Sequence, residues 1–103
     1  MISNTQSISV IEADKRISLY CPIGKDYYTA DVKMKFLPNA FYMDYMDLDQ
    51  FINNMGGSNL TIEEAIEQIY NELQRYMPKK VSVTIEAFSN THLHVIVTKG
   101  DVA

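Results

Sequence analysis

Cys21 is the only cysteine of the chain, and its side chain is the best nucleophile in the sequence. A thiolate is a soft and strongly nucleophilic group, and a loop at the end of a hairpin can expose it to a substrate. A lone cysteine excludes an intramolecular disulfide and a thiolate zinc cluster, and it suits a reducing compartment. Two interpretations stay open from the residue type alone: a reactive thiol, or a small buried side chain.

Glu63 is a carboxylate without an obvious structural task. Thr61 and Glu64 have the spacing of a capping box and suffice to begin a helix. Glu63 then falls in the first helical turn, where it either stabilises the positive end of the helix or binds a ligand.

Two other groups of polar residues are candidates for binding. Asp44, Asp47 and Asp49 form an acidic cluster, but Asp47 with Gln50 three residues later predicts an N-cap, which makes the cluster typical of a solvated helix start. Residues 92 and 94 are histidines on one face of a predicted strand. A metal site needs at least a third ligand, so we predict that the protein holds no metal there.

Alternating hydrophobicity predicts four strands that position these residues. Segment 7–22 is extended, with apolar side chains at Ile8, Val10, Ile17 and Leu19. Segment 28–37 alternates more regularly, and the turn residues 23–26 join the two strands as a hairpin that closes just after Cys21. Segments 81–87 and 93–97 alternate in the same way around a turn at 89–91 and form a second hairpin.

Two helices lie between the hairpins. A short helix follows Asp47 and ends at the Gly-rich segment 56–59. A longer one follows Thr61, carries apolar residues at three- and four-residue steps up to Met77, and is stopped by Pro78. The order strand, strand, helix, helix, strand, strand predicts an α+β fold in which a four-stranded antiparallel sheet carries both helices on one face.

The 103 residues are the length of one domain, which we assign to 1–103. The net charge of −4 and scattered basic residues argue against direct nucleic-acid binding. Apolar runs are far shorter than the roughly 20 residues of a membrane span, and residues 1–9 lack the pattern of a signal peptide. We therefore expect a cytoplasmic protein without a membrane partner, whose exposed sheet edges favour homo-oligomers.

A resemblance to a known family appears around Cys21. The matching residues are Cys21-Pro22-Ile23-Gly24, Ala30 at the start of an alternating strand, and Leu37-Pro38-Asn39. Together with the order of the elements, they resemble the NADPH-dependent 7-cyano-7-deazaguanine reductases of queuosine biosynthesis, a step toward tRNA modification. These nitrile-reducing oxidoreductases belong to the tunnelling-fold superfamily. The resemblance runs without a gap from Cys21 to Leu73 and continues into the last two strands.

The resemblance implies roles for three residues. Cys21 falls on the catalytic cysteine, whose thiolate attacks the substrate nitrile to form a covalent thioimide. Glu63 falls on the glutamate that anchors the purine-like ring, for which a carboxylate is well suited because it accepts two parallel hydrogen bonds. Asp44 matches the acidic residue that begins the reductase signature. The resemblance also implies a homo-oligomer with sites between subunits.

The chain departs from the family at several positions. Tyr28 stands in place of the proton-donating aspartate, and Asp26 is the nearest acid, so either residue is the candidate proton donor. NADPH is the implied cofactor, but Met46 and Asp49 replace the lysines that contact it. Three interpretations follow: a divergent nitrile reductase, a non-reducing protein that binds a purine or pterin, or a structural homo-oligomer without catalysis.

Overall fold

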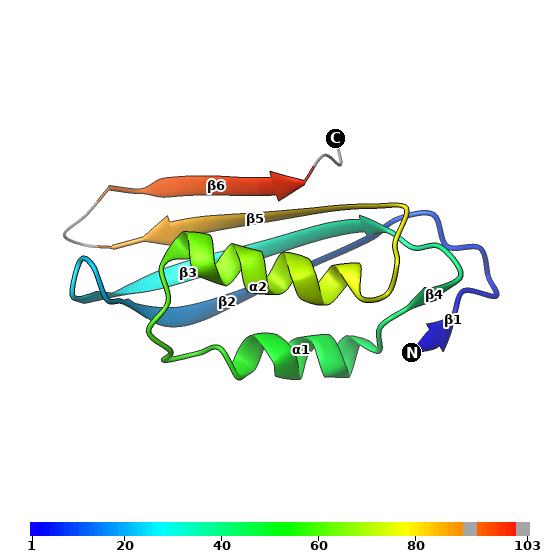
Figure 1. Cartoon of the computed structure of the whole chain (residues 1–103), viewed down its shortest axis with the longest axis horizontal. Coiled ribbons are helices and arrows are strands. Elements are labelled where there is room, and N and C mark those ends of the chain that lie inside the picture. The colour runs from blue at the N-terminus through cyan, green and yellow to red at the C-terminus, as the bar shows by residue number, and fades with distance from the viewer. Residues whose placement is uncertain (90–92, 101–103) are drawn as a thin grey trace.

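A computed structural model describes residues 1–89 and 93–100, which form two helices in front of one face of a sheet (Figure 1). The elements are β1 (Ile2–Ser3), β2 (Ile11–Cys21), β3 (Asp26–Leu37), β4 (Phe41–Tyr42), α1 (Tyr45–Asn53), α2 (Ile62–Gln74), β5 (Lys80–Phe88) and β6 (Val95–Gly100). Asn90, Thr91 and His92, on which the second predicted turn and the histidine pair depend, lie outside the described residues.

The main sheet has the strand order β2-β3-β5-β6, and all its pairs are antiparallel. The first hairpin runs in unbroken register from the pair Ile11 and Phe36 to the pair Cys21 and Asp26. The predicted α+β class, the order of the elements and the four-stranded antiparallel sheet with its helices on one face are therefore confirmed.

The hydrophobic core lies between the sheet and the helices. Alternate residues of each strand point to it, as the period of two requires. Its strand residues include Ile17, Leu19, Ala30, Val32, Met34, Phe36, Val81, Val83, Ile85 and Ala87. Its helix residues are Leu48 and Ile52 of α1 and Ala65, Ile66, Ile69 and Leu73 of α2.

The segment before Ile11 differs from the prediction. Ile8 and Val10 are 40% and 46% exposed and lie outside β2. The core side of β2 carries odd-numbered residues, so these even-numbered ones face away from the core even if the strand is extended backwards. Instead, β1 near the N-terminus pairs with β4 in a two-stranded antiparallel sheet. The residues around Ile2 are too few to show an alternating pattern, so this strand was not predicted.

Both helices have ends that the sequence placed wrongly. The N-cap of α1 is Asp44, whose side chain accepts a hydrogen bond from the N–H of Met46 at 2.8 Å, and Asp47 lies in the first turn. The helix therefore begins three residues earlier than Asp47 predicts, because both acids have capping chemistry and only Asp44 has extended backbone. α2 ends at Gln74, and Met77, with a φ of 49°, is 71% exposed rather than part of the apolar face.

Each outer strand of the main sheet carries a lysine on the helix side. Lys15 of β2 forms an ion pair with Asp49 of α1, and Lys99 of β6 forms one with Glu67 of α2. The Lys99 ammonium lies 4.9 Å from the centre of the Tyr70 ring, and its hydrogen bond to Glu67 lowers the pKa of that carboxyl. The two outer strands are thus tied to the two helices by charged side chains.

Candidate functional site

Cys21 lies at the end of the first hairpin, at the left of Figure 1. It is half-buried, and the N–H of Gly24 approaches its sulfur at 3.4 Å. Asp26 is its direct partner across the hairpin. The tight loop between them is closed by a hydrogen bond from the N–H of Lys25 to the carbonyl of Cys21 at 2.8 Å. This loop fixes the thiol and the nearest acid side by side, as the predicted turn requires.

A cavity of about 310 Å³ opens beside this hairpin end. It is lined by Cys21, Asp26, Tyr27, Tyr28, Ile62, Ala87, Phe88, Ser89, Leu93 and Val95. All three residues predicted to act in catalysis therefore border a single cavity. Most of its wall is apolar, which suits a flat aromatic ring.

Tyr28 is the most buried polar side chain of the cavity, at 7% exposed. Its hydroxyl donates a hydrogen bond to the carbonyl of Leu60 at 2.7 Å. Burial raises the pKa of this hydroxyl far above its usual range, and negative charge at Cys21 and Glu63 raises it further. Negative charge at Glu64 acts on this pKa in the same direction.

Glu63 is exposed in the first turn of α2, next to the cavity residue Ile62. The predicted capping box is confirmed: Thr61 accepts from the N–H of Glu64 at 3.2 Å, and the Glu64 carboxylate accepts from the N–H of Thr61 at 3.1 Å. Because this pair completes the cap, the Glu63 carboxylate is left outside it. Glu63 is therefore exposed one residue after the lining residue Ile62, and it is not itself one of the residues that line the cavity.

We expect Thr61→Ala to destabilise the protein by about 1 kcal/mol, the usual loss for an N-cap side chain. The measurement is urea unfolding followed by circular dichroism. Thr61→Ser is the matched control, because it keeps the acceptor oxygen and should stay within about 0.5 kcal/mol of wild type. An unchanged unfolding midpoint in Thr61→Ala would contradict the assigned cap.

The segment from Gly57 to Leu60 connects α2 to the hairpin through backbone hydrogen bonds, and only a helix break could be predicted there from the residue types. Gly57 donates to the carbonyl of Ser18 at 2.8 Å, and Leu60 donates to the carbonyl of Tyr20 at 3.0 Å. Gly57 has a φ of 77°, a backbone conformation that glycine adopts readily. The segment thus runs along the outer edge of β2, and α2 begins near the end of the hairpin at which Cys21 lies.

Asp44 does not join this group within one chain. It caps the start of α1, while the hairpin end lies beyond the other end of that helix (Figure 1). Its carboxylate accepts from the backbone of Met46 at 2.8 Å. Of the five site residues predicted from the sequence, Cys21, Asp26 and Tyr28 line one cavity, Glu63 lies one residue beyond the lining residue Ile62, and Asp44 lies apart.

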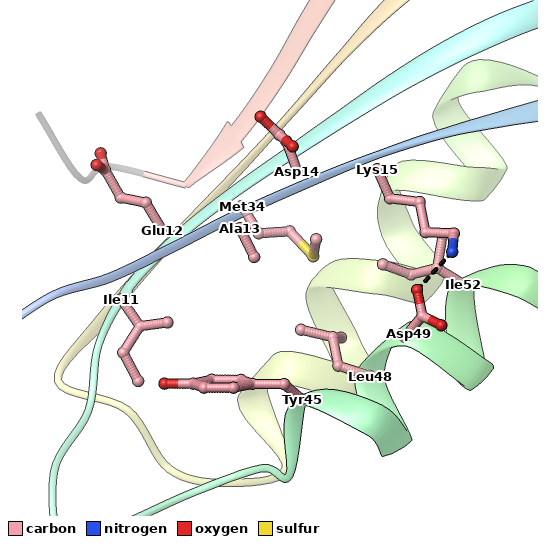
Figure 2. A pocket seen from close by; sticks show the side chains of 10 residues that line it. All are labelled: Ile11, Glu12, Ala13, Asp14, Lys15, Met34, Tyr45, Leu48, Asp49 and Ile52. Atoms are coloured by element: carbon pink, nitrogen blue, oxygen red, sulfur yellow. Dashed lines mark hydrogen bonds and ion pairs between the residues drawn. The ribbon is translucent and has the colours of Figure 1, made fainter.

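A second cavity, of about 350 Å³, lies between β2 and α1 (Figure 2). Its floor is apolar, with Ala13, Met34 and Leu48 among the lining residues. The ion pair between Lys15 and Asp49 closes one side. Asp49 is one of the two positions at which the family that the sequence resembles has a cofactor-contacting lysine, so the charge there is reversed and already paired.

Two searches of the described residues concern metal ligands and membrane-spanning helices. Residues 1–89 and 93–100 contain no cluster of three histidine, cysteine or acidic side chains arranged to hold a metal ion. His94 instead lies 2.6 Å from Glu86 and stacks on Phe88 with ring centres 4.6 Å apart. Neither of the two described helices is long and apolar enough to cross a membrane.

Comparison with known proteins identifies the fold. No protein-family model matches the sequence, and no curated protein matches it. Among solved structures, the crystal structure of the archaeosine synthase QueF-Like in the apo form matches with a TM-score of 0.83 and 19% sequence identity. The match covers 91% of this chain and 94% of the other. The chain has a tunnelling fold. The fold expected from the resemblance is therefore confirmed, and at this identity the match shows the fold alone.

Proposed function

We propose that this tunnelling-fold protein binds a purine-like ring in the cavity beside Cys21 and acts on a nitrile-bearing 7-deazapurine through a covalent thioimide. The observation that carries the proposal is the meeting of Cys21, Asp26 and Tyr28 in one largely apolar cavity. Glu63 lies beside it with its carboxylate outside the helix cap. A nucleophile, an acid and a bidentate acceptor for ring N–H groups are thus available at one end of the sheet.

The addition of the Cys21 thiol to the nitrile needs no external reagent. The Cys21 thiol gives its proton to the Asp26 carboxylate, and the sulfur adds to the nitrile carbon. One carbon–nitrogen π bond breaks, and its electron pair stays on nitrogen. Asp26 then returns the proton to that nitrogen, which leaves a thioimide. Glu63 orients the ring by accepting hydrogen bonds from two adjacent N–H groups.

We propose that the thioimide is not reduced at this site. The resemblance implies NADPH, but neither Asp49, whose carboxylate is paired with Lys15, nor Met46 offers the phosphates of that cofactor a positive charge. The solved structure that shares the fold is named a synthase. Reduction of the thioimide by NADPH is the alternative fate, and the same experiment tests it.

The test is intact-mass measurement of the purified protein after incubation with 7-cyano-7-deazaguanine. We expect a mass increase equal to one ligand, without consumption of added NADPH. 7-Deazaguanine, which lacks the nitrile, is the control and should give no covalent product. Absence of an adduct on the wild-type protein would overturn the proposal. An adduct that disappears as NADPH is oxidised would establish the reductase alternative in place of the non-reducing one.

The main sheet has two outer strands, β2 and β6. Segment 57–60 covers the edge of β2 at Ser18 and Tyr20, and the rest of the two edges offers backbone groups to a second copy of the chain. Tyr20 donates to the carbonyl of Ser58 and accepts from Leu60, so its backbone groups point away from β3. Every second residue of a strand has the same orientation, which places the N–H of Asp14 on the outer edge. We propose that copies pair through these edges and that neighbouring copies complete the site, with Asp44 as a contribution from the second copy.

Asp14→Pro is expected to form smaller oligomers than the wild type. Proline removes an N–H from the outer edge of β2, while the hydrogen bonds between β2 and β3 remain. The loss should raise the dissociation constant of the assembly by about tenfold or more, measured by light scattering across a dilution series. Asp14→Ala keeps the N–H and should match the wild-type mass. A wild-type monomer that still forms the adduct would contradict a site shared between subunits.

A further inference from the structure

We infer that Tyr28 is a positioning residue, which holds the Cys21 hairpin against the start of α2 through the carbonyl of Leu60, and that it does not supply the proton of the reaction. The inference deepens the proposed function and rests on it. It also decides between the two candidate proton donors, Asp26 and Tyr28, that the sequence left open.

The geometry commits the Tyr28 hydroxyl to a structural partner. A phenol has one hydrogen to donate, and here it is directed to the carbonyl of Leu60 at 2.7 Å. The side chain is 7% exposed, so its ring is held by the core while its hydroxyl reaches the segment that precedes α2. Leu60 directly precedes the N-cap residue Thr61, and Glu63 follows in the first turn.

Leu60 is held by both strands of the hairpin. Its N–H donates to the carbonyl of Tyr20 in β2 at 3.0 Å, and its own carbonyl accepts from Tyr28 in β3. Two hydrogen bonds in opposite directions fix the position of this residue relative to the hairpin end. Because Cys21 is on that hairpin and Glu63 is on the helix that follows Leu60, the bonds set the spacing between the nucleophile and the ring anchor.

The environment of the phenol supports the same role. Burial, with the nearby negative charges of Cys21 and Glu63, raises the pKa of Tyr28, so the hydroxyl releases its proton less readily than an ordinary tyrosine does. A donor is most effective when its pKa lies near the working pH. Asp26 is the direct cross-strand partner of Cys21 and borders the same cavity, so the hairpin already provides an acid beside the thiol.

The test compares Tyr28→Phe with Tyr27→Phe. Both changes remove one hydroxyl from a tyrosine that lines the cavity, but Tyr27 is 63% exposed. The rate of adduct formation is measured against the concentration of 7-cyano-7-deazaguanine at several pH values. We expect Tyr28→Phe to raise the half-saturating concentration by about tenfold, because the helix start loses its register with the hairpin. The maximal rate should stay within about twofold, and its pH profile should be unchanged.

Other results would overturn the inference. A maximal rate about a hundredfold lower in Tyr28→Phe, at an unchanged half-saturating concentration, would make Tyr28 the proton donor. A Tyr28→Asp variant that reacts faster than wild type would do the same, because a shorter side chain without the phenol cannot keep the bond to Leu60. Equal half-saturating concentrations for the Tyr28→Phe and Tyr27→Phe variants would also remove the positioning role.

A separate measurement keeps the inference distinct from the proposed function. If the wild-type protein forms no adduct, the proposed function fails, and amide hydrogen exchange still tests the contact. Exchange at Leu60 and Glu64 should be faster in Tyr28→Phe than in Tyr27→Phe, since the segment before α2 has lost one of its two attachments. Equal exchange in the two variants would overturn the contact as a positioning device.

Discussion

Cys21→Ser is expected to abolish the covalent adduct with 7-cyano-7-deazaguanine, with a rate of formation at least about a thousandfold below that of wild type. A serine hydroxyl is a far weaker nucleophile than a thiolate, because an alcohol gives up its proton to a carboxylate such as Asp26 far less readily than a thiol does. The change replaces sulfur by oxygen in a half-buried side chain that accepts one weak contact from Gly24, so the hairpin should fold as before. The measurement is intact mass over time.

The control for this variant is non-covalent binding. Isothermal titration should show that Cys21→Ser still binds the ring with an affinity within a few-fold of that for 7-deazaguanine on the wild type, because the other residues of the cavity wall and Glu63 are unchanged. A variant that neither reacts nor binds would point to a structural role for the thiol. Persistence of the adduct in Cys21→Ser would show that another side chain is the nucleophile.

Glu63→Gln is expected to weaken binding of a guanine-like ring by about 1.5–3 kcal/mol, which corresponds to roughly 10- to 150-fold in affinity. The carboxylate accepts two charge-assisted hydrogen bonds. A glutamine amide accepts with its one oxygen, and its NH2 group faces the second N–H of the ring without forming a hydrogen bond. Titration calorimetry in the Cys21→Ser background measures this loss without interference from covalent chemistry.

Glu64→Gln provides a matched control one residue away. It removes the same charge from the same helical turn, and glutamine also completes a capping box with Thr61. We expect it to keep ring binding within about twofold of the Cys21→Ser parent. Equal affinities for the Glu63→Gln and Glu64→Gln variants would leave Glu63 as a first-turn acid without a role in recognition.

The parts of the fold that depend on periodicity could be predicted from the sequence. The alternation at Ala30, Val32, Met34 and Phe36 identifies a half-buried strand, because a sheet face admits few other patterns. The start of α1 could not be fixed in the same way. Asp44 and Asp47 both have capping chemistry, and only the backbone conformation that the folded chain imposes selects Asp44.

The candidate site could be predicted only in part for a similar reason. Residue types and the family resemblance pointed to Cys21 and Glu63, and the fold places Cys21 in the cavity wall and Glu63 one residue beyond the lining residue Ile62. The contacts that bring them together are backbone bonds of segment 57–60 with β2 and the bond from Tyr28 to Leu60. A backbone acceptor leaves no mark in a sequence, so the attachment of the helix start to the hairpin could not be foreseen. Asp44 was assigned by resemblance, which gives a role but not a position within one chain.

The lysines on the helix side of the two outer strands make amyloid-like growth at the sheet edges less favourable. An open strand edge accepts almost any extended chain, and stacked sheets built that way are very stable. Lys15 and Lys99 each place an ammonium group on the helix side of an edge, tied to a helix carboxylate. A foreign strand that adds to either edge must lie against this charge and leave it poorly solvated. Only a partner whose own surface accommodates the ion pairs can join at low cost, so the edges through which we propose that copies pair also discriminate against misfolded chains.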